Sequence, residues 1–249
     1  MSLEAKENSG QIPLPEERSN DPEFLRLTKI QQEQSSRRQA IRQRKLDEAA
    51  DFAAEHFSII AGNADLKSAR IICWSDNNHI FHTEDEDHFT RIVELVAERG
   101  DVILTEGVGS LQASGREEYS WKKIWAGKKG IVVLGWDDAK AHAETNDSLH
   151  QAKQKYFKDQ DLEYFAKRQK EIFMRTSPVR ERSMIKTITA IENDKRFAGK
   201  RIFIPSGAAH LKAKAVQQEL QQFKFTVLQT KQDASLESIF EDFLMQPEK

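Results

Sequence analysis

Five short apolar segments, separated by longer stretches that favour helix, constrain the fold of this chain more than any other feature. They are 69–74 (ARIICW), 101–106 (DVILTE), 130–135 (GIVVLG), 201–206 (RIFIPS) and 225–228 (FTVL). Continuously apolar runs rich in β-branched residues are typical of strands buried on both faces. Because they alternate with helical stretches, they predict an α/β domain with a central, mostly parallel sheet flanked by helices.

The segments between these runs carry helix signals. Residues 86–100 place their apolar side chains on one helical face and end in glycine, as a helix does. Ser177 as a cap and Pro178 at the first helical position predict the start of another helix, and residues 235–246 predict a last amphipathic one. The stretch of about 138–172 is too long for a single crossover and predicts a helical excursion over the sheet.

The N-terminal part of the chain differs from the rest in its amino-acid composition and pattern. Residues 1–20 are polar, with two prolines, and predict a flexible tail. Residues 21–62 favour helix, with Asp21 as a cap ahead of Pro22, and predict an N-terminal helical extension that is also a candidate surface for oligomerisation. The α/β domain is therefore expected over 63–249.

Composition excludes several classes of protein. The formal net charge of the 249 residues is -2, so no nucleic-acid partner is expected, and the basic run at 37–45 is interpreted as a solvated helix face. The single cysteine, Cys73, excludes a disulfide framework and fits a reducing compartment. No apolar run is long enough for a membrane span and no signal peptide is recognisable, which predicts a soluble, cytoplasmic protein.

Reactive side chains follow four of the five predicted strands. His79 follows the first, Glu106 closes the second, Asp137 follows the third and His210 follows the fourth. Because the carboxyl ends of parallel strands meet at one edge of a sheet, these groups are expected to converge there. Glu106 belongs to an apolar strand register, where a carboxylate needs an ion-pair partner or a metal. Two imidazoles with carboxylates suit Zn²⁺, Mn²⁺ or Fe²⁺.

Three motifs in the chain are similar to a known superfamily. The sequences ILTEG at 103–107, RERSMIKTI at 180–188 and GAAHL at 207–211 resemble the group that includes TraB, the Tiki proteins, the haem-binding ChaN proteins and the erythromycin esterases. The most specific part of the resemblance covers about 175–230. It implies a metal or hydrolytic centre built from two Gly-x-x-His motifs and an acidic residue. The second motif is intact, whereas Asp76 replaces the glycine of the first.

The resemblance and the expected cluster together favour a metal-dependent hydrolase that acts on a peptide or a small-molecule ester. A divalent ion would lower the pKa of bound water and supply hydroxide near neutral pH. The candidate metal ligands are His79, Glu106, Asp137 and His210. The candidate catalytic residues are Glu106 and His210 as bases and Arg182 as the group that holds an oxyanion or substrate carboxylate. Trp74 and Trp136 are candidates for lining the substrate pocket, with core packing as the alternative for both.

A second interpretation stays open. The chain can be a non-catalytic member of the superfamily that binds haem or another small ligand, or that acts as an interaction module. Asp76 in the first histidine motif and the long, charged N-terminal helix favour this interpretation.

Overall fold

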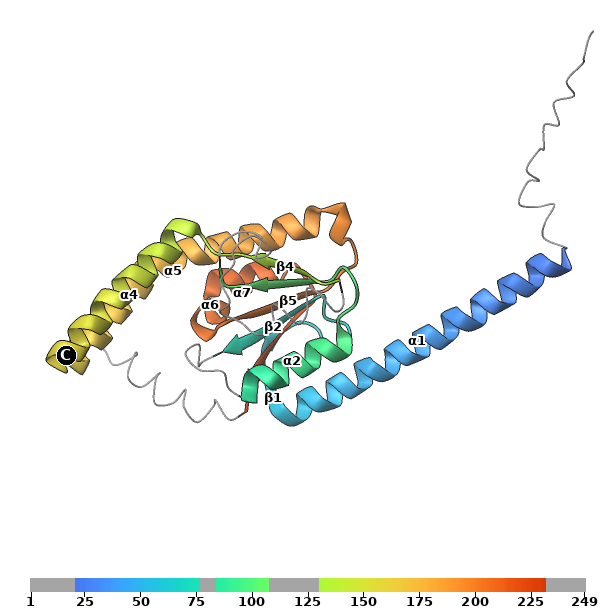
Figure 1. Cartoon of the computed structure of the whole chain (residues 1–249), viewed down its shortest axis with the longest axis horizontal. Coiled ribbons are helices and arrows are strands. Elements are labelled where there is room, and N and C mark those ends of the chain that lie inside the picture. Colours follow the sequence, from blue (N-terminus) through green and yellow to red (C-terminus); the bar gives the residue numbers. More distant parts are fainter. Residues whose placement is uncertain (1–20, 77–83, 108–129, 232–249) are drawn as a thin grey trace, which may run out of the picture. The chain divides into compact units, whose positions relative to one another are not determined.

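The computed structural model of the protein describes residues 21–76, 84–107 and 130–231. Six strands of these residues form one sheet in the order β1-β6-β2-β5-β3-β4 (Figure 1). Neighbouring strands from β6 to β4 run parallel, and β1 runs antiparallel to β6. The strands are β1 (Phe57–Gly62), β2 (Ile71–Asp76), β3 (Val102–Thr105), β4 (Val132–Gly135), β5 (Ile202–Gly207) and β6 (Phe225–Thr230). The predicted mostly parallel α/β sheet is confirmed, and all five predicted strands belong to it.

Helices account for most of the remaining described residues. They are α1 (Pro22–His56), α2 (Glu84–Val96), α4 (Ala139–Asp159), α5 (Leu162–Asn193), α6 (Ala208–Lys212) and α7 (Lys214–Leu220), with a single 3₁₀ turn η1 (Lys195–Phe197). The chain forms two compact units, residues 1–45 and 46–249. In the first unit the described part is a continuous, largely exposed helix, so oligomerisation through it stays a prediction. The predicted tail at 1–20 and the predicted helix at 235–246 lie outside the described residues.

The sheet contains one strand that the sequence did not reveal. The helix expected to continue through Ile60 ends at His56, and β1 pairs along β6 instead. Phe57 is buried, whereas Ile59 and Ile60 are exposed. Helical spacing predicted a continued amphipathic helix. Instead, the backbone of this short segment forms hydrogen bonds with the edge of β6, and this strand pairing outweighs the local helix propensity.

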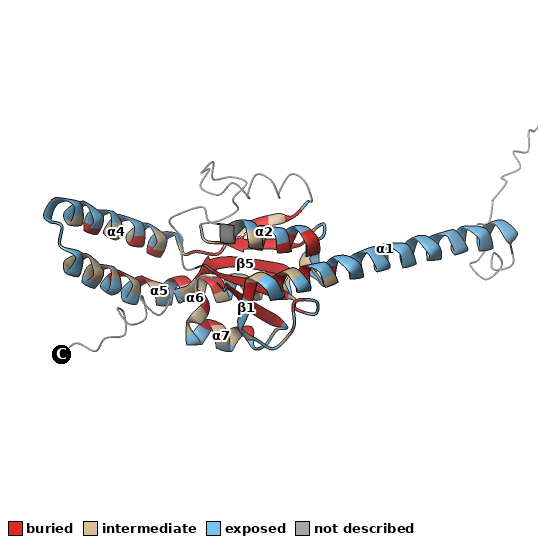
Figure 2. Cartoon of the chain, turned by 90° about the horizontal axis from the view of Figure 1, so that it is seen from below, coloured by how far each residue is buried: buried red, intermediate tan, exposed pale blue. Residues whose placement is uncertain are grey.

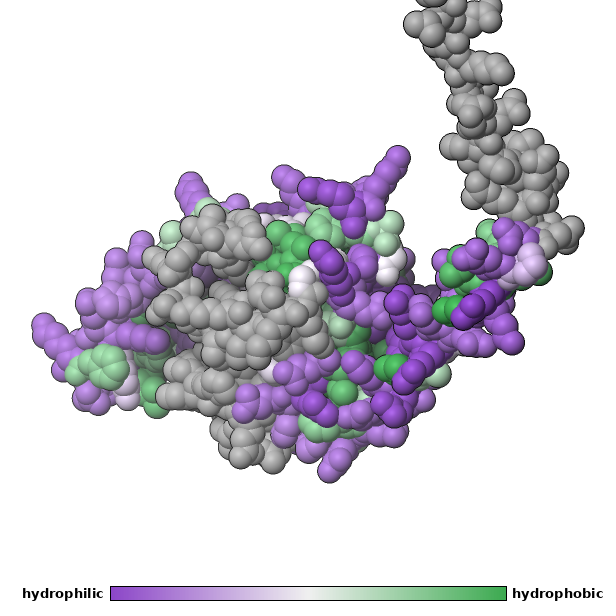
Figure 3. All heavy atoms as spheres, turned by 45° about the vertical axis from the view of Figure 1, so that its right-hand side comes forward, coloured by the Kyte–Doolittle hydropathy of each residue, from purple (hydrophilic) through white to green (hydrophobic). Residues whose placement is uncertain are grey.

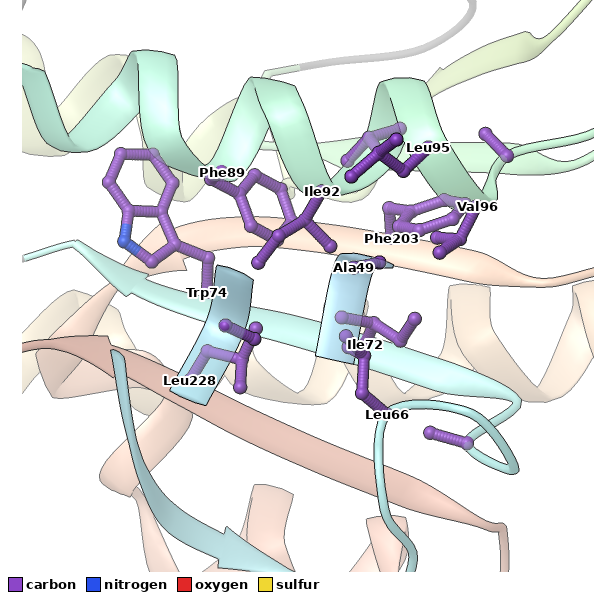
Figure 4. Close-up of a cluster of buried hydrophobic side chains, with 14 of the residues drawn as sticks. Ala49, Leu66, Ile72, Trp74, Phe89, Ile92, Leu95, Val96, Phe203 and Leu228 are labelled. Carbon is purple, nitrogen blue, oxygen red and sulfur yellow. The ribbon is translucent and has the colours of Figure 1, made fainter. Parts of the chain in front are cut away.

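Side chains that alternate along the strands build two separate cores. In β2, Ile72 and Trp74 join a cluster formed with α2 and the last turns of α1, whereas Ile71 and Cys73 join a cluster formed with α5, α6 and α7. Figure 4 shows the first cluster, with Trp74 beside Phe89 under α2. The sheet is therefore covered on both faces: β3, β5 and β6 are buried along their whole length, whereas the edge strand β1 is mostly exposed (Figure 2).

The predicted excursion is an antiparallel pair of helices, α4 and α5 (Figure 2). The turn between them uses Gln160 in the left-handed conformation and Asp161, whose carboxylate accepts the Tyr164 N–H as a cap. The predicted helix start at Ser177 and Pro178 is wrong, because α5 runs through Pro178. Pro178 is exposed, so water can bond the carbonyl group that the proline leaves without a donor.

The surface of the described residues is mainly hydrophilic. Figure 3 shows one face on which charged and polar side chains surround small hydrophobic patches. Within the described segments, no helix has an apolar stretch of the length that a membrane crossing needs.

Gly62 tests how tightly β1 is fastened to the sheet. It has φ +148° and a Cβ at this position would lie 2.7 Å from the Phe225 carbonyl oxygen, a backbone atom. We expect Gly62→Ala to lower the free energy of unfolding by about 1–3 kcal/mol, as measured by urea denaturation. Gly199→Ala is the control, since Gly199 also has positive φ but no atom within 4 Å of its Cβ position. Equal losses in both variants would show that backbone strain alone, and not contact with β6, limits residue 62.

Candidate functional site

Five side chains at the carboxyl ends of the parallel strands form one row on the face covered by α5, α6 and α7. In order across the sheet they are Trp136 after β4, Glu106 after β3, Ser206 in β5, Ser75 in β2 and Gln229 in β6. Ser75 is in register with both Ser206 and Gln229. Trp136 and Glu106 directly follow the paired residues Gly135 and Thr105. We call this set the carboxyl-end row.

The row is polar, whereas the layers beneath it are apolar. Two residues earlier on the same strands, and on the same face, lie Leu134, Leu104, Ile204, Cys73 and Val227, which belong to or pack against the second core cluster. Ligands of parallel α/β sheets bind at the carboxyl ends of strands, because loops and helix N-termini converge there. The change from apolar to polar at this layer therefore marks the candidate site.

Arg180 on α5 holds two carboxylates at this edge. Its Nε donates to both Asp137 oxygens at 2.9 and 3.0 Å, and its Nη2 donates to Asp137 Oδ2 at 2.6 Å and to Glu106 Oε2 at 3.1 Å. The side chains of Arg180 and Asp137 are 5% and 0% exposed. Glu106 Oε1 in turn accepts from Ser206 Oγ at 3.1 Å and from the Gly207 N–H at 2.9 Å. A planar, permanently charged guanidinium suits this fork between two acids.

These contacts set the charges of the cluster. Burial by itself raises the pKa of the Asp137 carboxyl, but hydrogen bonds from His142 and Arg180 outweigh burial and hold its pKa below the ordinary value. Burial lowers the pKa of Arg180, and its bonds to Asp137 and the charge of Glu106 raise it above the ordinary value overall. Asp137 is therefore ionised and Arg180 is charged near neutral pH.

Asp137 also orients a histidine. His142 Nδ1 lies 2.8 Å from Asp137 Oδ2, and His142 Nε2 lies 2.9 Å from Asn146 Nδ2. A carboxylate cannot donate, so Nδ1 carries the proton and Nε2 accepts from the amide. The His142 side chain is 28% exposed, while Asp137 is enclosed. A buried acid that fixes the tautomer of a partly exposed imidazole is the arrangement of a general base.

His210 lies at the same edge, on α6. Its ring packs edge-on against Trp136, with ring centroids 5.4 Å apart. Its Nδ1 is 3.7 Å from Glu181 Oε1, too far for a hydrogen bond. The Gly207 N–H that starts α6 bonds Glu106, so the helix that carries His210 is attached to the carboxylate cluster.

The structure brings together four of the residues predicted from the sequence. Glu106, Asp137, Trp136 and His210 are connected through Arg180, Gly207 and the Trp136–His210 contact. His79 lies outside the described residues, so its place in a shared site stays a prediction.

Two predicted residues lie elsewhere. Arg182 is exposed, and the arginine that enters the site is Arg180. The buried face of α5 carries Thr176, Arg180 and Met184 at intervals of four, so a residue two positions later points away. Trp74 faces the opposite core, where it stacks on Phe89 at 5.3 Å and donates to Thr230 Oγ1, and does not line the carboxyl-end row.

Three residues of the site were missed in the sequence: Arg180, His142 and Ser206. Arg180 could have been found, because it stands four residues before Met184 in the apolar stripe of its helix. Ser206 could have been placed on the row by counting in twos from Ile202. For His142 the only signal was its position one turn after the Asp138 cap of α4, which many surface histidines share.

The described residues do not fit a divalent metal as they are placed. Both oxygens of Asp137 and both oxygens of Glu106 already accept hydrogen bonds, and the guanidinium between them would repel a cation. Within 21–76, 84–107 and 130–231, no three His, Cys, Asp or Glu side chains are grouped to hold an ion. Haem binding, the alternative expected from the sequence, stays a prediction.

Comparison of the chain with protein-family models, curated proteins and solved structures found no significant match.

Arg180 and Arg182 provide a matched pair for testing the ion cluster. Arg180→Met removes the guanidinium from the buried Asp137 and the partly buried Glu106, and we expect it to cost about 3–5 kcal/mol of unfolding free energy. Arg182→Met removes an exposed charge and should change that free energy by less than about 0.5 kcal/mol. Urea denaturation measures both. Equal effects would contradict the assignment of Arg180 to the site.

The lowered pKa of Asp137 predicts a specific pH dependence. Because the folded state binds this proton less tightly than the unfolded state, the stabilisation is complete above the unfolded pKa of about 3.9 and is lost as pH falls through the folded pKa. Asp137→Asn should therefore be less stable than the wild type at pH 7, and the difference should shrink below about pH 4. Urea midpoints measured from pH 7 to pH 3 test this; a difference that stays constant with pH would contradict it.

Proposed function

We propose that the protein is a hydrolase of peptide or ester bonds whose reaction centre is the Asp137–His142 pair at the carboxyl edge of the sheet. One observation carries this proposal: a fully enclosed carboxylate holds Nδ1–H of a partly exposed imidazole and is itself held ionised by Arg180. The resemblance of ILTEG, RERSMIKTI and GAAHL to hydrolytic relatives supports the same reaction class. The proposed reaction uses side chains of the described residues alone.

His142 would act as the general base. As water attacks the substrate carbonyl carbon, its proton passes to His142 Nε2 and the carbonyl π electrons move to the oxygen. The C–O or C–N bond then breaks as the oxyanion collapses, and the proton on Nε2 moves to the leaving group. The carboxylate of Asp137 stabilises the imidazolium formed between these steps and keeps the ring in position. Asn146, which occupies Nε2, is exposed and can turn away when substrate arrives.

Arg180 is the candidate donor to the oxyanion. Its Nε and Nη2 are committed to Asp137 and Glu106, and within the described residues its Nη1 makes no hydrogen bond. A charged donor fixed before the reaction stabilises developing negative charge without reorganising. Glu106 then serves as an anchor for the guanidinium, tied to the start of α6 through Gly207 and Ser206.

A second function, binding of a small ligand without turnover, is favoured because the carboxylate oxygens of Asp137 and Glu106 already accept hydrogen bonds. Every carboxylate oxygen of Asp137 and Glu106 already has a partner, which is also what a rigid, non-catalytic scaffold requires. In this case His142 has no chemical role. For either function we place the protein in the cytoplasm, on the basis of its single cysteine, Cys73, which is buried.

His142→Gln separates the two functions. Glutamine can still donate to Asp137, but it takes up no proton near neutral pH. We expect kcat/KM to fall by about 10²- to 10⁴-fold, with a melting temperature close to that of the wild type. Activity is measured with p-nitrophenyl acetate and with a set of internally quenched fluorogenic peptides.

The same helix offers a matched control. His150 is exposed and bonds Gln154 at 2.8 Å with the i, i+4 geometry that His142 and Asn146 show at 2.9 Å. His150 has no carboxylate partner among the described residues, so His150→Gln should keep full activity. If the wild type cleaves none of these substrates, or if both variants retain its activity, the hydrolase proposal fails.

A further inference from the structure

Four polar groups at the carboxyl edge are buried without a partner. Within the described residues, Ser75 Oγ, Gln229 Nε2, Trp136 Nε1 and His210 Nδ1 each expose almost no surface and make no hydrogen bond. Ser75, Gln229 and Trp136 belong to the carboxyl-end row. His210 lies beside the row, where its ring packs on Trp136. Two other such atoms lie away from the row: Thr226 Oγ1 on the opposite side of β6, and His88 Nδ1 on α2.

Unmet hydrogen bonds of this kind are costly. More than nine in ten buried polar groups in folded proteins have a partner, and each one without a partner destabilises the fold. Leu or Val could occupy the positions of Ser75 and Gln229, as aliphatic residues do one layer below in the same strands. A concentration of unmet groups in one layer, at the edge where α/β sheets bind ligands, points to a ligand that completes them.

The unmet groups define the chemistry of that ligand. The indole N–H of Trp136 and the amide N–H of Gln229 can only donate, so the ligand must present acceptor oxygens. Among the described residues, the charged groups paired at this edge are the carboxylates of Glu106, Asp137 and Glu181 and the guanidinium of Arg180. This excess of negative charge disfavours a carboxylate or a phosphate. An uncharged carbonyl oxygen satisfies both conditions.

We propose that the carboxyl-end row is a subsite for uncharged amide groups, which makes a peptide-like amide the substrate class. That this ligand is a substrate rests on the proposed hydrolase function. That it binds to the row does not. Ser75, between Ser206 and Gln229 in register, is the central contact of the subsite. Trp136 and His210 contribute from β4 and α6.

The indole signal of Trp136 reports this binding directly. The chain has four tryptophans, so a ¹H–¹⁵N spectrum of the full-length protein shows four indole signals, and Trp136→Phe assigns one of them. Addition of N-acetyl-alaninamide should shift the Trp136 signal downfield with saturation, because the N–H gains an acceptor. The Trp74 indole, which already donates to Thr230 Oγ1 on the other face, should not move. Acetate and inorganic phosphate, the charged probes, should have no effect.

Other outcomes overturn the proposal. A Trp136 signal that none of the three probes moves shows that no ligand of this kind reaches the row. A shift with phosphate or acetate equal to that with the amide refutes the choice of an uncharged ligand. The indole signal does not depend on turnover. If the His142→Gln experiment refutes the hydrolase proposal, amide binding to the row is still tested, and a failure of amide binding does not refute the hydrolase proposal.

Two adjacent serines give an independent test. Ser75 and Ser206 are register partners in the row, but only the Ser206 hydroxyl bonds Glu106. Ser75→Ala should leave the melting temperature of the ligand-free protein unchanged or higher, and weaken binding of N-acetyl-alaninamide about five- to tenfold. Ser206→Ala should lower the melting temperature by about 2–4 °C. If Ser75→Ala lowers it as much, the Ser75 hydroxyl is already bonded in the free protein and the proposal is wrong.

Discussion

One buried and one partly buried carboxylate lie side by side at the edge of this sheet because a guanidinium lies between them. Asp137 and Glu106 come from neighbouring strand ends, and their charges would make both positions unstable without Arg180. The same contact holds α5 against the ends of β3 and β4. Glu106 also accepts the N–H of Gly207, the residue directly before α6. The positions of His142 and His210 therefore both depend on a single side chain of α5.

The sheet changes from an apolar core to a polar edge along its strands. Two layers of apolar side chains on the face of α5, α6 and α7 supply the apolar burial, and the third layer, at the carboxyl ends, is mostly polar. Because successive residues on one face are two apart, the change falls at the same step in the three paired strands β2, β5 and β6: from Cys73 to Ser75, from Ile204 to Ser206 and from Val227 to Gln229. Parallel, in-register strands turn that repeated change into one continuous surface.

The fold could be predicted further from the sequence than the site could. The five buried strands were evident because each is a short, β-branched run, whereas β1 was not, since Phe57 and Ile60 also fit helical spacing and its pairing with β6 joins segments far apart in the chain. At the site, Glu106 was recognised because a carboxylate in an apolar register needs a partner. The identity of that partner depended on which residues of α5 face the sheet: Arg180 does and Arg182 does not. Pro178 made this hard to predict, because its pattern suggested that a new helix begins there.

The contrast between the two ends of the row has a physical reason. Next to Trp136, the carboxylate of Glu106 has Arg180, Ser206 and Gly207 as partners, so its hydrogen bonds are made before any ligand binds. At the Gln229 end the polar groups are neutral, and leaving them without partners costs far less than leaving a buried carboxylate alone. A protein can afford unmet hydrogen bonds only among such neutral groups. In the proposed subsite, an incoming molecule would thus gain most beside β2 and β6, whereas beside β3 and β4 the buried charges are already held by bonds within the chain.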